Sequence, residues 1–495
     1  MMQHAGFKKQ EFKHQGFKNF NMKLVSLAVT ATFLSGCQSI WPDYLRPKVA
    51  VPPNYSEAID QAKDQANNPI SNTWWTLYQD PVLNDLVAKA LVNNTDIKLA
   101  AARIEEADAV MREVGAALFP EVDLDAKGTR SRVTEAGAFP VFSGNPRNNY
   151  IAQLGSSFEI DFWGKFRRAK ESARAQALSS RYAKDTVALS LSGLVASNYF
   201  VLRSVESQIA VTQDNLKSRH DSLALTKRRL DGGIASALDV HQAEVASANL
   251  SAQLAELTRL RAITLHQLAV LTSTLDLDVA AADIKTLPIP PTPPAGLPSS
   301  LLEARPDVRQ AEEQMIAANA NIAVAKAALY PSISLTASLG GESLELGDIL
   351  KSAARIWTAG LSLSLPIFDS GRLNSKVDQA SAKQKQVLAS YEAAVQNAFR
   401  EVNDALINLR QYTEREAALN RSQEAAKKAL DVSENRYQSG YSAYLDVLDA
   451  QRVYNDAALA FIQSRQARLV ATVDLFKALG GGWSANNALV PPKAN

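Results

Sequence analysis

Four short segments of the chain alternate between apolar and polar positions. They cover about 120–130, 150–162, 332–341 and 357–366, and they share a similar length and phase. Such alternation places apolar side chains on one face of a β-strand and polar side chains on the other. Segments of about ten residues also match the span of a tilted transmembrane strand. We therefore expect four transmembrane strands, although a soluble sheet packed on helices would show the same alternation.

The segments that follow each pair of strands are free of proline and rich in helix-forming residues. We expect very long helices over 165–230 and 372–438, each extending about 100 Å at ~1.5 Å per residue. A returning helix follows each of them, which gives helical hairpins at 165–275 and 372–478. A shorter single helix is expected before each strand pair.

Glycine and serine mark the turns of both predicted hairpins. Gly232, Gly233 and Gly440 stand where a helix ends and can supply the left-handed cap. Ser236 and Ser442 stand where the N-caps of the returning helices belong. Both hairpins are therefore expected to turn within a few residues.

The two halves of the chain resemble each other. RRLDGGIASALDVHQAE at 228–244 matches NRYQSGYSAYLDVLDAQ at 435–451, and Arg203 matches Arg410 at the same offset. A tandem duplication explains this, and internal repeats indicate a quasi-symmetric architecture.

The predicted fold is mainly α with a small β part. The predicted domains are a leader (1–36), an N-terminal extension (37–78), a first repeat (79–285), a proline-rich linker (286–299), a second repeat (300–480) and a tail (481–495).

The N-terminus has the layout of an export signal that ends at the only cysteine. Residues 22–37, MKLVSLAVTATFLSGC, join a positive start, an apolar run and small residues before Cys37. This ending resembles a bacterial lipoprotein box, in which the cysteine carries a covalent lipid. Met22 is then the expected start of the chain, and by the same resemblance Gln38 favours the outer membrane. A plain secretory signal with a chance cysteine is the alternative.

Composition excludes several classes of function. Lys and Arg total 53 against 51 Asp and Glu, a net charge of +2, so no nucleic-acid partner is expected. One cysteine allows no intrachain disulfide and no cysteine zinc site. After the leader, no uninterrupted apolar run reaches the ~20 residues of a membrane-spanning helix. We find no phosphate loop or hydrolase motif, and expect neither an enzyme nor a cofactor other than the lipid.

Four strands are too few to close a membrane barrel. Unpaired backbone groups at the edges of a sheet cost several kcal/mol each in lipid, and the smallest usual barrel has about eight strands. Several copies of the chain must therefore share one barrel. The polar faces, with Ser, Thr, Asp and Glu, favour water inside, and so favour three copies and twelve strands over two copies and eight.

Several segments together resemble the outer membrane factor (TolC-like) family of trimeric efflux channels, in its lipoprotein branch. They are WWTLYQDPVLNDLVAKALVNNTDIKLAAARIEEA (74–107), ARPDVRQAE (304–312), LPIFDSGRL (365–373) and the two LDV turns. The resemblance implies a β-barrel in the outer membrane joined to a periplasmic α-barrel. It implies a homotrimer, anchored by its lipid in the bacterial outer membrane. Its implied partners are a periplasmic adaptor and an inner-membrane pump of the resistance-nodulation-division type.

The resemblance also implies an entrance at the helical tips that is closed at rest and opens like an iris. Asp446 and Asp449 match the acidic ring of that entrance, and Asp239 is a repeat-related partner. In related channels, residues at the positions of Arg436 and Tyr437 tie neighbouring hairpins shut. Ser442 stands where the family has an arginine, so other contacts must close this channel, and the aromatic side chains of Tyr441 and Tyr444 are candidates. The expected adaptor contacts are Gly232, Gly233, Gly440 and Tyr441.

Two functions therefore compete. The first is a passive channel that carries drugs or other toxic compounds from the periplasm to the exterior. The second is a periplasmic helical scaffold or binding lipoprotein without a pore, which would be released once its lipid anchor is removed. The residues do not identify the exported compound.

Overall fold

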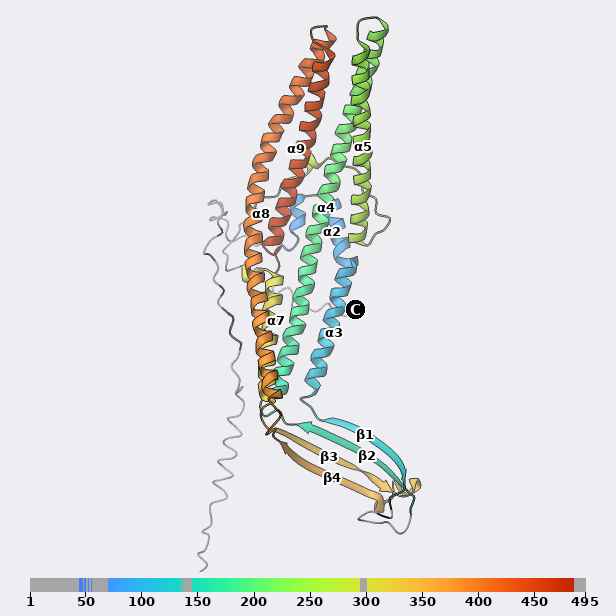
Figure 1. Cartoon of the computed structure of the whole chain (residues 1–495), viewed down its shortest axis with the longest axis vertical. Coiled ribbons are helices and arrows are strands. Elements are labelled where there is room, and N and C mark those ends of the chain that lie inside the picture. Colours follow the sequence, from blue (N-terminus) through green and yellow to red (C-terminus); the bar gives the residue numbers. More distant parts are fainter. Residues whose placement is uncertain are drawn as a thin grey trace, which may run out of the picture.

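The chain is elongated, with a sheet at one end and helical hairpin turns at the other (Figure 1). The structure, a computed structural model, describes residues 44–47, 49, 52, 55, 70–134, 136, 145–293 and 301–484. The predicted leader with Met22, the expected lipidation site Cys37, the tail beyond 484 and residues 294–299 of the linker lie outside these described residues.

Two helical hairpins form the long arms of the molecule, as the sequence predicts. Each outgoing helix has 67 residues, and a shorter helix returns antiparallel to it. The proline-free stretches of the sequence thus form uninterrupted helices that extend about 100 Å from the sheet to the turns. The first hairpin consists of α4 (Lys165–Asp231) and α5 (Ala237–Thr272), and the second of α8 (Arg372–Gln438) and α9 (Tyr444–Ala478).

The expectation of one helix before each strand pair is wrong, because each of these helices is broken. In the first half, Asn94 leaves helical geometry, and its side chain accepts a hydrogen bond from the Asp96 amide at 2.8 Å. In the second half, Pro306 disfavours helical backbone at the preceding Arg305. The pieces are α2 (Pro81–Asn93) and α3 (Thr95–Ala116), then α6 (Leu301–Ala304) and α7 (Pro306–Ala327). Short 3-10 turns are η2 (Trp74–Tyr78), η3 (Ile284–Thr286), η5 (Leu346–Asp348) and η6 (Ser352–Ala354).

All four predicted strands are present and form one antiparallel sheet in the order β1-β2-β3-β4. β1 and β4 have no second neighbour among the described residues, so both edges of the sheet are open. The strands are β1 (Glu121–Ser131), β2 (Arg147–Glu159), β3 (Ser332–Ser343) and β4 (Arg355–Ser364).

The register of the sheet separates apolar from polar side chains, as expected. Leu124, Leu154, Leu339 and Trp357 lie opposite one another in one row across all four strands, and they are 72, 53, 63 and 76% exposed. The neighbouring row on the opposite face is small and polar, with Asp123, Gly155, Ser338 and Thr358. A large apolar row that no described residue covers is typical of a surface that faces lipid or a partner.

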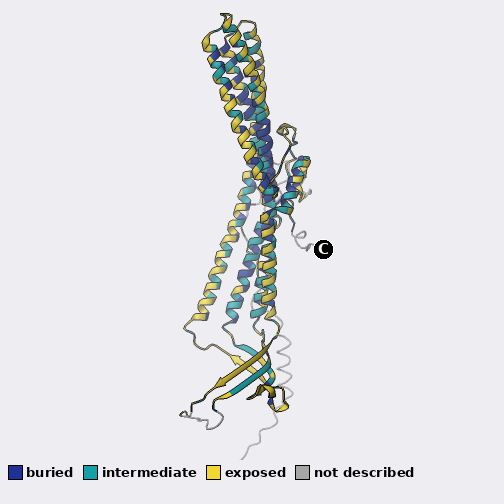
Figure 2. Cartoon of the chain, turned by 90° about the vertical axis from the view of Figure 1, so that its right-hand side faces the viewer, coloured by how far each residue is buried: buried dark blue, intermediate teal, exposed yellow. Residues whose placement is uncertain are grey.

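Most of the buried side chains lie in the helical part, away from the sheet (Figure 2). Trp74 and Phe476 stack with ring centroids 5.4 Å apart, and Tyr78 contacts Phe200 at 4.8 Å. This cluster joins the N-terminal turn η2 to α4 and α9. A second cluster, around Met315, joins α7 to α8 and α9. The hairpins are therefore held together mainly near the middle of the molecule.

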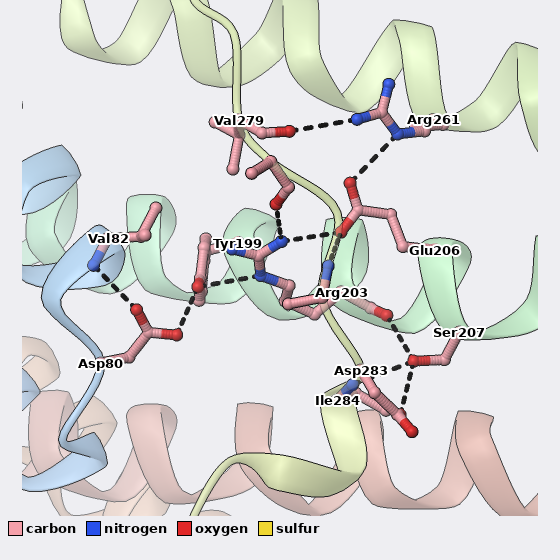
Figure 3. A network of polar contacts seen from close by, with 12 residues as sticks. Asp80, Val82, Tyr199, Arg203, Glu206, Ser207, Arg261, Val279, Asp283 and Ile284 are labelled. Atoms are coloured by element: carbon pink, nitrogen blue, oxygen red, sulfur yellow. Dashed lines mark hydrogen bonds and ion pairs between the residues drawn. The ribbon is translucent and has the colours of Figure 1, made fainter. Parts of the chain in front are cut away.

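Arg203 of α4 lies at the centre of a buried polar network (Figure 3). Its guanidinium donates to the Tyr199 hydroxyl at 2.9 Å and to Glu206 at 2.8 Å. Tyr199 donates in turn to Asp80, the N-cap of α2, and Arg261 of α5 donates to Glu206 at 3.0 Å. The side chains of Arg203 and Glu206 are each 3% exposed. Buried charges persist only where such bonds satisfy them, so the network fastens α2, α4 and α5 together.

The chain after α5, residues 276–289, crosses the helices and is here called the strap. The amide of Ile284 donates to the Ser207 hydroxyl of α4 at 2.9 Å (Figure 3). From the other side, Arg465 of α9 donates to the carbonyls of Ile284 at 3.1 Å and Leu287 at 2.6 Å. The strap thus connects one helix of each hairpin.

Three consecutive glycines follow α9, at 480–482, with φ of +88°, +58° and +75°. A Cβ on Gly480 would overlap the carbonyl oxygen of Ala304, and one on Gly482 would overlap the backbone at Ile70 and Ser71. Only glycine combines a positive φ with so close an approach of two backbones. These residues join the end of α9 to α6 and to the N-terminal part of the chain.

One helix among the described residues, α4, is long and apolar enough to cross a membrane by length and composition alone. Within its most apolar window, 44% of the residues are buried. A core helix of a helical bundle passes the same test, and α4 packs against α3, α5, α7 and α9. We therefore assign α4 to the helical body of the protein.

Candidate functional site

The two hairpin turns lie side by side at the end farthest from the sheet (Figure 1). At the first, Gly233 has φ +73° and the Ile234 amide donates to the Arg229 carbonyl at 2.8 Å. At the second, Gly440 has φ +82° and the Tyr441 amide donates to the Arg436 carbonyl at 2.8 Å. Both turns use the left-handed glycine cap, as the sequence predicts. Gly232, Gly233, Gly440 and Tyr441, the expected adaptor contacts, are all exposed.

The starts of the returning helices differ between the two hairpins. Ser236 caps α5 as expected, and the carboxylate of Asp239 completes a capping box by accepting from the Ser236 amide at 3.1 Å. Asp239, predicted as a gate residue, thus serves its own helix here. The expectation for Ser442 is wrong, because the residue before α9 is Ala443 and no side chain caps this helix. The Ser442 hydroxyl is buried and has no hydrogen-bond partner among the described residues.

Arg229, at the end of α4, joins the two hairpins. Its guanidinium lies over the Tyr437 ring at 4.4 Å and donates to the carbonyls of Tyr437 and Gln438 at 3.5 Å each. Tyr437 in turn contacts Tyr444, with ring centroids 5.5 Å apart. Tyr444 is 3% exposed and packs against Ala243 and Val447, and burial raises the pKa of its hydroxyl. The Arg229 guanidinium therefore holds the two turns of one chain together through the Tyr437 ring and the two carbonyls of α8.

In the sequence, Arg229 is distinguished only as the repeat mate of Arg436, 207 positions further on. Arg436, predicted as a gate residue, is exposed on the surface of α8. The constant repeat offset was the available signal, because it placed one arginine at the end of each outgoing helix. The offset could not show which of the two arginines contacts the other hairpin, since that depends on how the two hairpins pack together. Tyr437 and Tyr444, both predicted as gate residues, lie in contact with each other.

Asp446 and Asp449 lie one turn apart on an exposed face of α9. Asp449 accepts from Arg452 at 2.6 Å, and Arg452 also lies 3.7 Å from Asp456. The carboxylate of Asp446 has no ion-pair partner within the described part of the chain. These carboxylates can therefore attract cations from solvent. The described residues contain no group of three or more His, Cys, Asp or Glu arranged to hold a metal ion.

Known proteins with similar sequences belong to one functional class. The sequence pattern of the family described as "Outer membrane efflux protein" matches residues 86–274 and 297–481. The chain is 35% identical over 473 residues to the "Probable efflux pump outer membrane protein TtgC" of Pseudomonas putida, covering 93% of this chain and 96% of that protein. It is 31% identical to the "Cation efflux system protein CusC" of Escherichia coli, covering 93% of this chain and 99% of that protein.

Two solved structures with the same fold are outer membrane channels. The channel CmeC of Campylobacter jejuni superposes with a TM-score of 0.85 at 25% identity, covering 90% of this chain and 96% of that one. The open state of the MtrE channel of Neisseria gonorrhoeae gives a TM-score of 0.81 at 31% identity, covering 90% and 98%. The likeness therefore covers nine-tenths of this chain.

Proposed function

Because the chain belongs to the outer membrane efflux protein family, and is thus an efflux channel of the outer membrane, we propose that three copies form one continuous exit duct. In this proposal the three sheets make a twelve-stranded barrel, and the hairpins make a helical barrel that extends into the periplasm. The lipid on Cys37 anchors each copy to the same membrane.

The observation that carries this proposal is the sheet. Its large apolar row is 53 to 76% exposed in a single chain, and β1 and β4 lack a second neighbour among the described residues. Lipid requires that every backbone amide and carbonyl be paired. Pairing β1 of one copy with β4 of the next satisfies both edges, places the apolar rows outside and leaves the polar rows around water. A scaffold lipoprotein with a soluble sheet would leave the same apolar row exposed to water.

The hairpin turns form the entrance in this proposal. Asp446 and Asp449 of each copy then surround one axis, and the contacts of Arg229 hold the turns in the closed arrangement. The adaptor approaches at Gly232, Gly233, Gly440 and Tyr441, and the inner-membrane pump of a tripartite system delivers the cargo. Relatives are named for antibiotic, toluene and cation efflux, so we infer that the pump, rather than this chain, selects the cargo.

Single-channel recording in planar bilayers tests the duct and its entrance together. We expect the purified protein to conduct small currents that favour cations over anions. Replacing Asp446 and Asp449 by Asn removes the carboxylates but keeps side-chain size, so the cation-to-anion permeability ratio should fall several-fold, toward one. Asp431→Asn is the matched control, because Asp431 lies on α8 near the same end and is paired with Lys427 at 3.0 Å.

The possible outcomes separate the parts of the proposal. An unchanged permeability ratio in the double variant would remove the acidic ring from the entrance but keep the channel. A protein that inserts as a trimer and never conducts, even with its turns loosened, would contradict the duct itself.

Arg229→Ala should loosen the turns. The variant loses the contact with the Tyr437 ring and the two hydrogen bonds to the second hairpin, worth about 1–3 kcal/mol together. We expect the open probability in planar bilayers to rise by about tenfold. Arg228→Ala is the control, because Arg228 is the neighbouring arginine and its one side-chain hydrogen bond among the described residues goes to the Ala224 carbonyl of its own helix. Equal open probabilities in the Arg229→Ala and Arg228→Ala variants would show that other contacts close the channel.

A further inference from the structure

A groove between α5 and α9 lies near the turns, beside Asp449 of the proposed entrance. Its volume is about 660 Å³, within the range of about 300–1,000 Å³ that is typical of small-molecule sites. Leu238, Val245 and Leu250 line it from α5, and Leu445 and Leu448 from α9. Most of the wall is therefore apolar.

One charged side chain, Arg219 of α4, lines the groove although it is only 5% exposed. Nη1 of its guanidinium has no hydrogen-bond partner among the described residues. Tyr444 and Glu434 are near enough to favour its charged form electrostatically, but burial lowers the pKa of Arg219 below its ordinary value. Glu434 instead accepts a hydrogen bond from Gln451 at 3.1 Å. The Tyr444 hydroxyl is also buried without a partner in the described part of the chain.

The other charges of the groove are paired with one another. Arg452 lies between Asp449 and Asp456, and His241 contacts Glu244 at 3.3 Å. Arg219 is therefore the one guanidinium of the groove without a carboxylate partner among the described residues. An arginine stays protonated in proteins, and a buried charge without a counter-ion is costly. A ligand that brings an anion to Arg219 would remove this cost.

We propose that the α5/α9 groove binds a small amphipathic organic anion, a carboxylate or sulfonate with an apolar ring or tail. The acid group pairs with the guanidinium of Arg219, which lines the groove. The apolar part packs against the leucine and valine side chains of α5 and α9. Binding at this site requires the helical hairpins but not conduction, so it can be tested independently of the channel.

Two dyes of nearly the same shape provide the test. 8-Anilinonaphthalene-1-sulfonate carries an acid group, and N-phenyl-1-naphthylamine is its neutral counterpart. Both are titrated by fluorescence into the purified full chain in detergent, with protein-free micelles as the blank. Arg219→Met keeps most of the side-chain volume and removes the charge. We expect the dissociation constant of the sulfonate to rise about tenfold or more, and that of the neutral dye to change less than twofold.

A second pair of variants keeps Arg219 and locates the site. Ala246 lines the groove, whereas Ala248 is an exposed residue of the same helix outside it. Ala246→Phe should fill the groove and abolish the saturable binding of the sulfonate, and Ala248→Phe should leave it unchanged. The comparison of Ala246→Phe with Ala248→Phe still tests the proposed site if Arg219→Met does not fold.

Three results would overturn the proposal. The first is a sulfonate affinity that is the same in Arg219→Met as in the wild type, which would mean that the sulfonate does not pair with Arg219. The second is an equal loss of both dyes in Arg219→Met, which would make the groove a purely apolar site. The third is saturable binding that survives Ala246→Phe.

Discussion

Gly480→Ala is expected to lower the apparent melting temperature of the purified protein by about 5 °C or more. The new Cβ would overlap the carbonyl oxygen of Ala304 and lie 2.9 Å from its carbonyl carbon. Because both atoms belong to backbone, neither can rotate away, and α6 or the end of α9 must move. The positive φ of +88° adds roughly 1–2 kcal/mol of its own. Together the two effects are worth about 3 kcal/mol or more, which corresponds to a shift of this size in a large protein.

Gly371→Ala separates the two contributions. Gly371 caps the start of α8 with φ +81°, and nothing lies within 4 Å of a Cβ built on it. The control therefore carries the backbone strain without the overlap, and should lower the midpoint less than half as much. Helical circular dichroism at one fixed heating rate gives the comparison, since a membrane protein of this size unfolds irreversibly. Equal decreases in the melting midpoint of the two variants would mean that the backbone at Ala304 moves away from the new Cβ at no cost in stability.

Arg203→Met is expected to destabilise the protein by about 3–5 kcal/mol, the usual cost of breaking a buried ion pair. Glu206 keeps its hydrogen bond from Arg261 at 3.0 Å but loses the one from Arg203 at 2.8 Å. The side chain of Glu206 is only 3% exposed, so water cannot replace the lost donor. The Tyr199 hydroxyl loses its donor at the same time. The measurement is again the apparent melting midpoint, combined with protease cleavage at the strap.

Arg259→Met is the control for this variant. Arg259 pairs with Glu256 on the exposed surface of α5, with both side chains more than half exposed, and such pairs contribute at most ~1 kcal/mol. Adding Glu206→Gln to Arg203→Met should recover part of the loss, because the uncompensated carboxylate disappears. A melting midpoint equal to that of Arg259→Met would show that the network does not stabilise the helical body.

The regular parts of this fold were predictable because their patterns are periodic. The period-two segments located four strands and their apolar faces to within a few residues, and the absence of proline indicated the long helices α4 and α8. The breaks at Asn94 and Arg305 were missed, since a single capping amide or an Arg-Pro pair changes the local geometry without changing the apolar pattern.

The candidate site was predictable only in part. The glycine turns and the acidic pair on α9 follow from motifs that are local in the sequence. The contact of Arg229 with Tyr437 joins residues 208 positions apart, and the network of Arg203 joins α2, α4, α5 and the strap. Such contacts depend on which helix faces have been brought together, and no spacing within the chain encodes them.

The unbroken 67-residue helices also have a mechanical consequence. Each begins within a few residues of a strand and ends at a turn, so it acts as a lever about 100 Å long. A tilt of only ~5° about its base displaces its far end by ~9 Å at that length. A wide opening at the far end therefore needs almost no rearrangement beside the membrane, where the strand pairing stays intact.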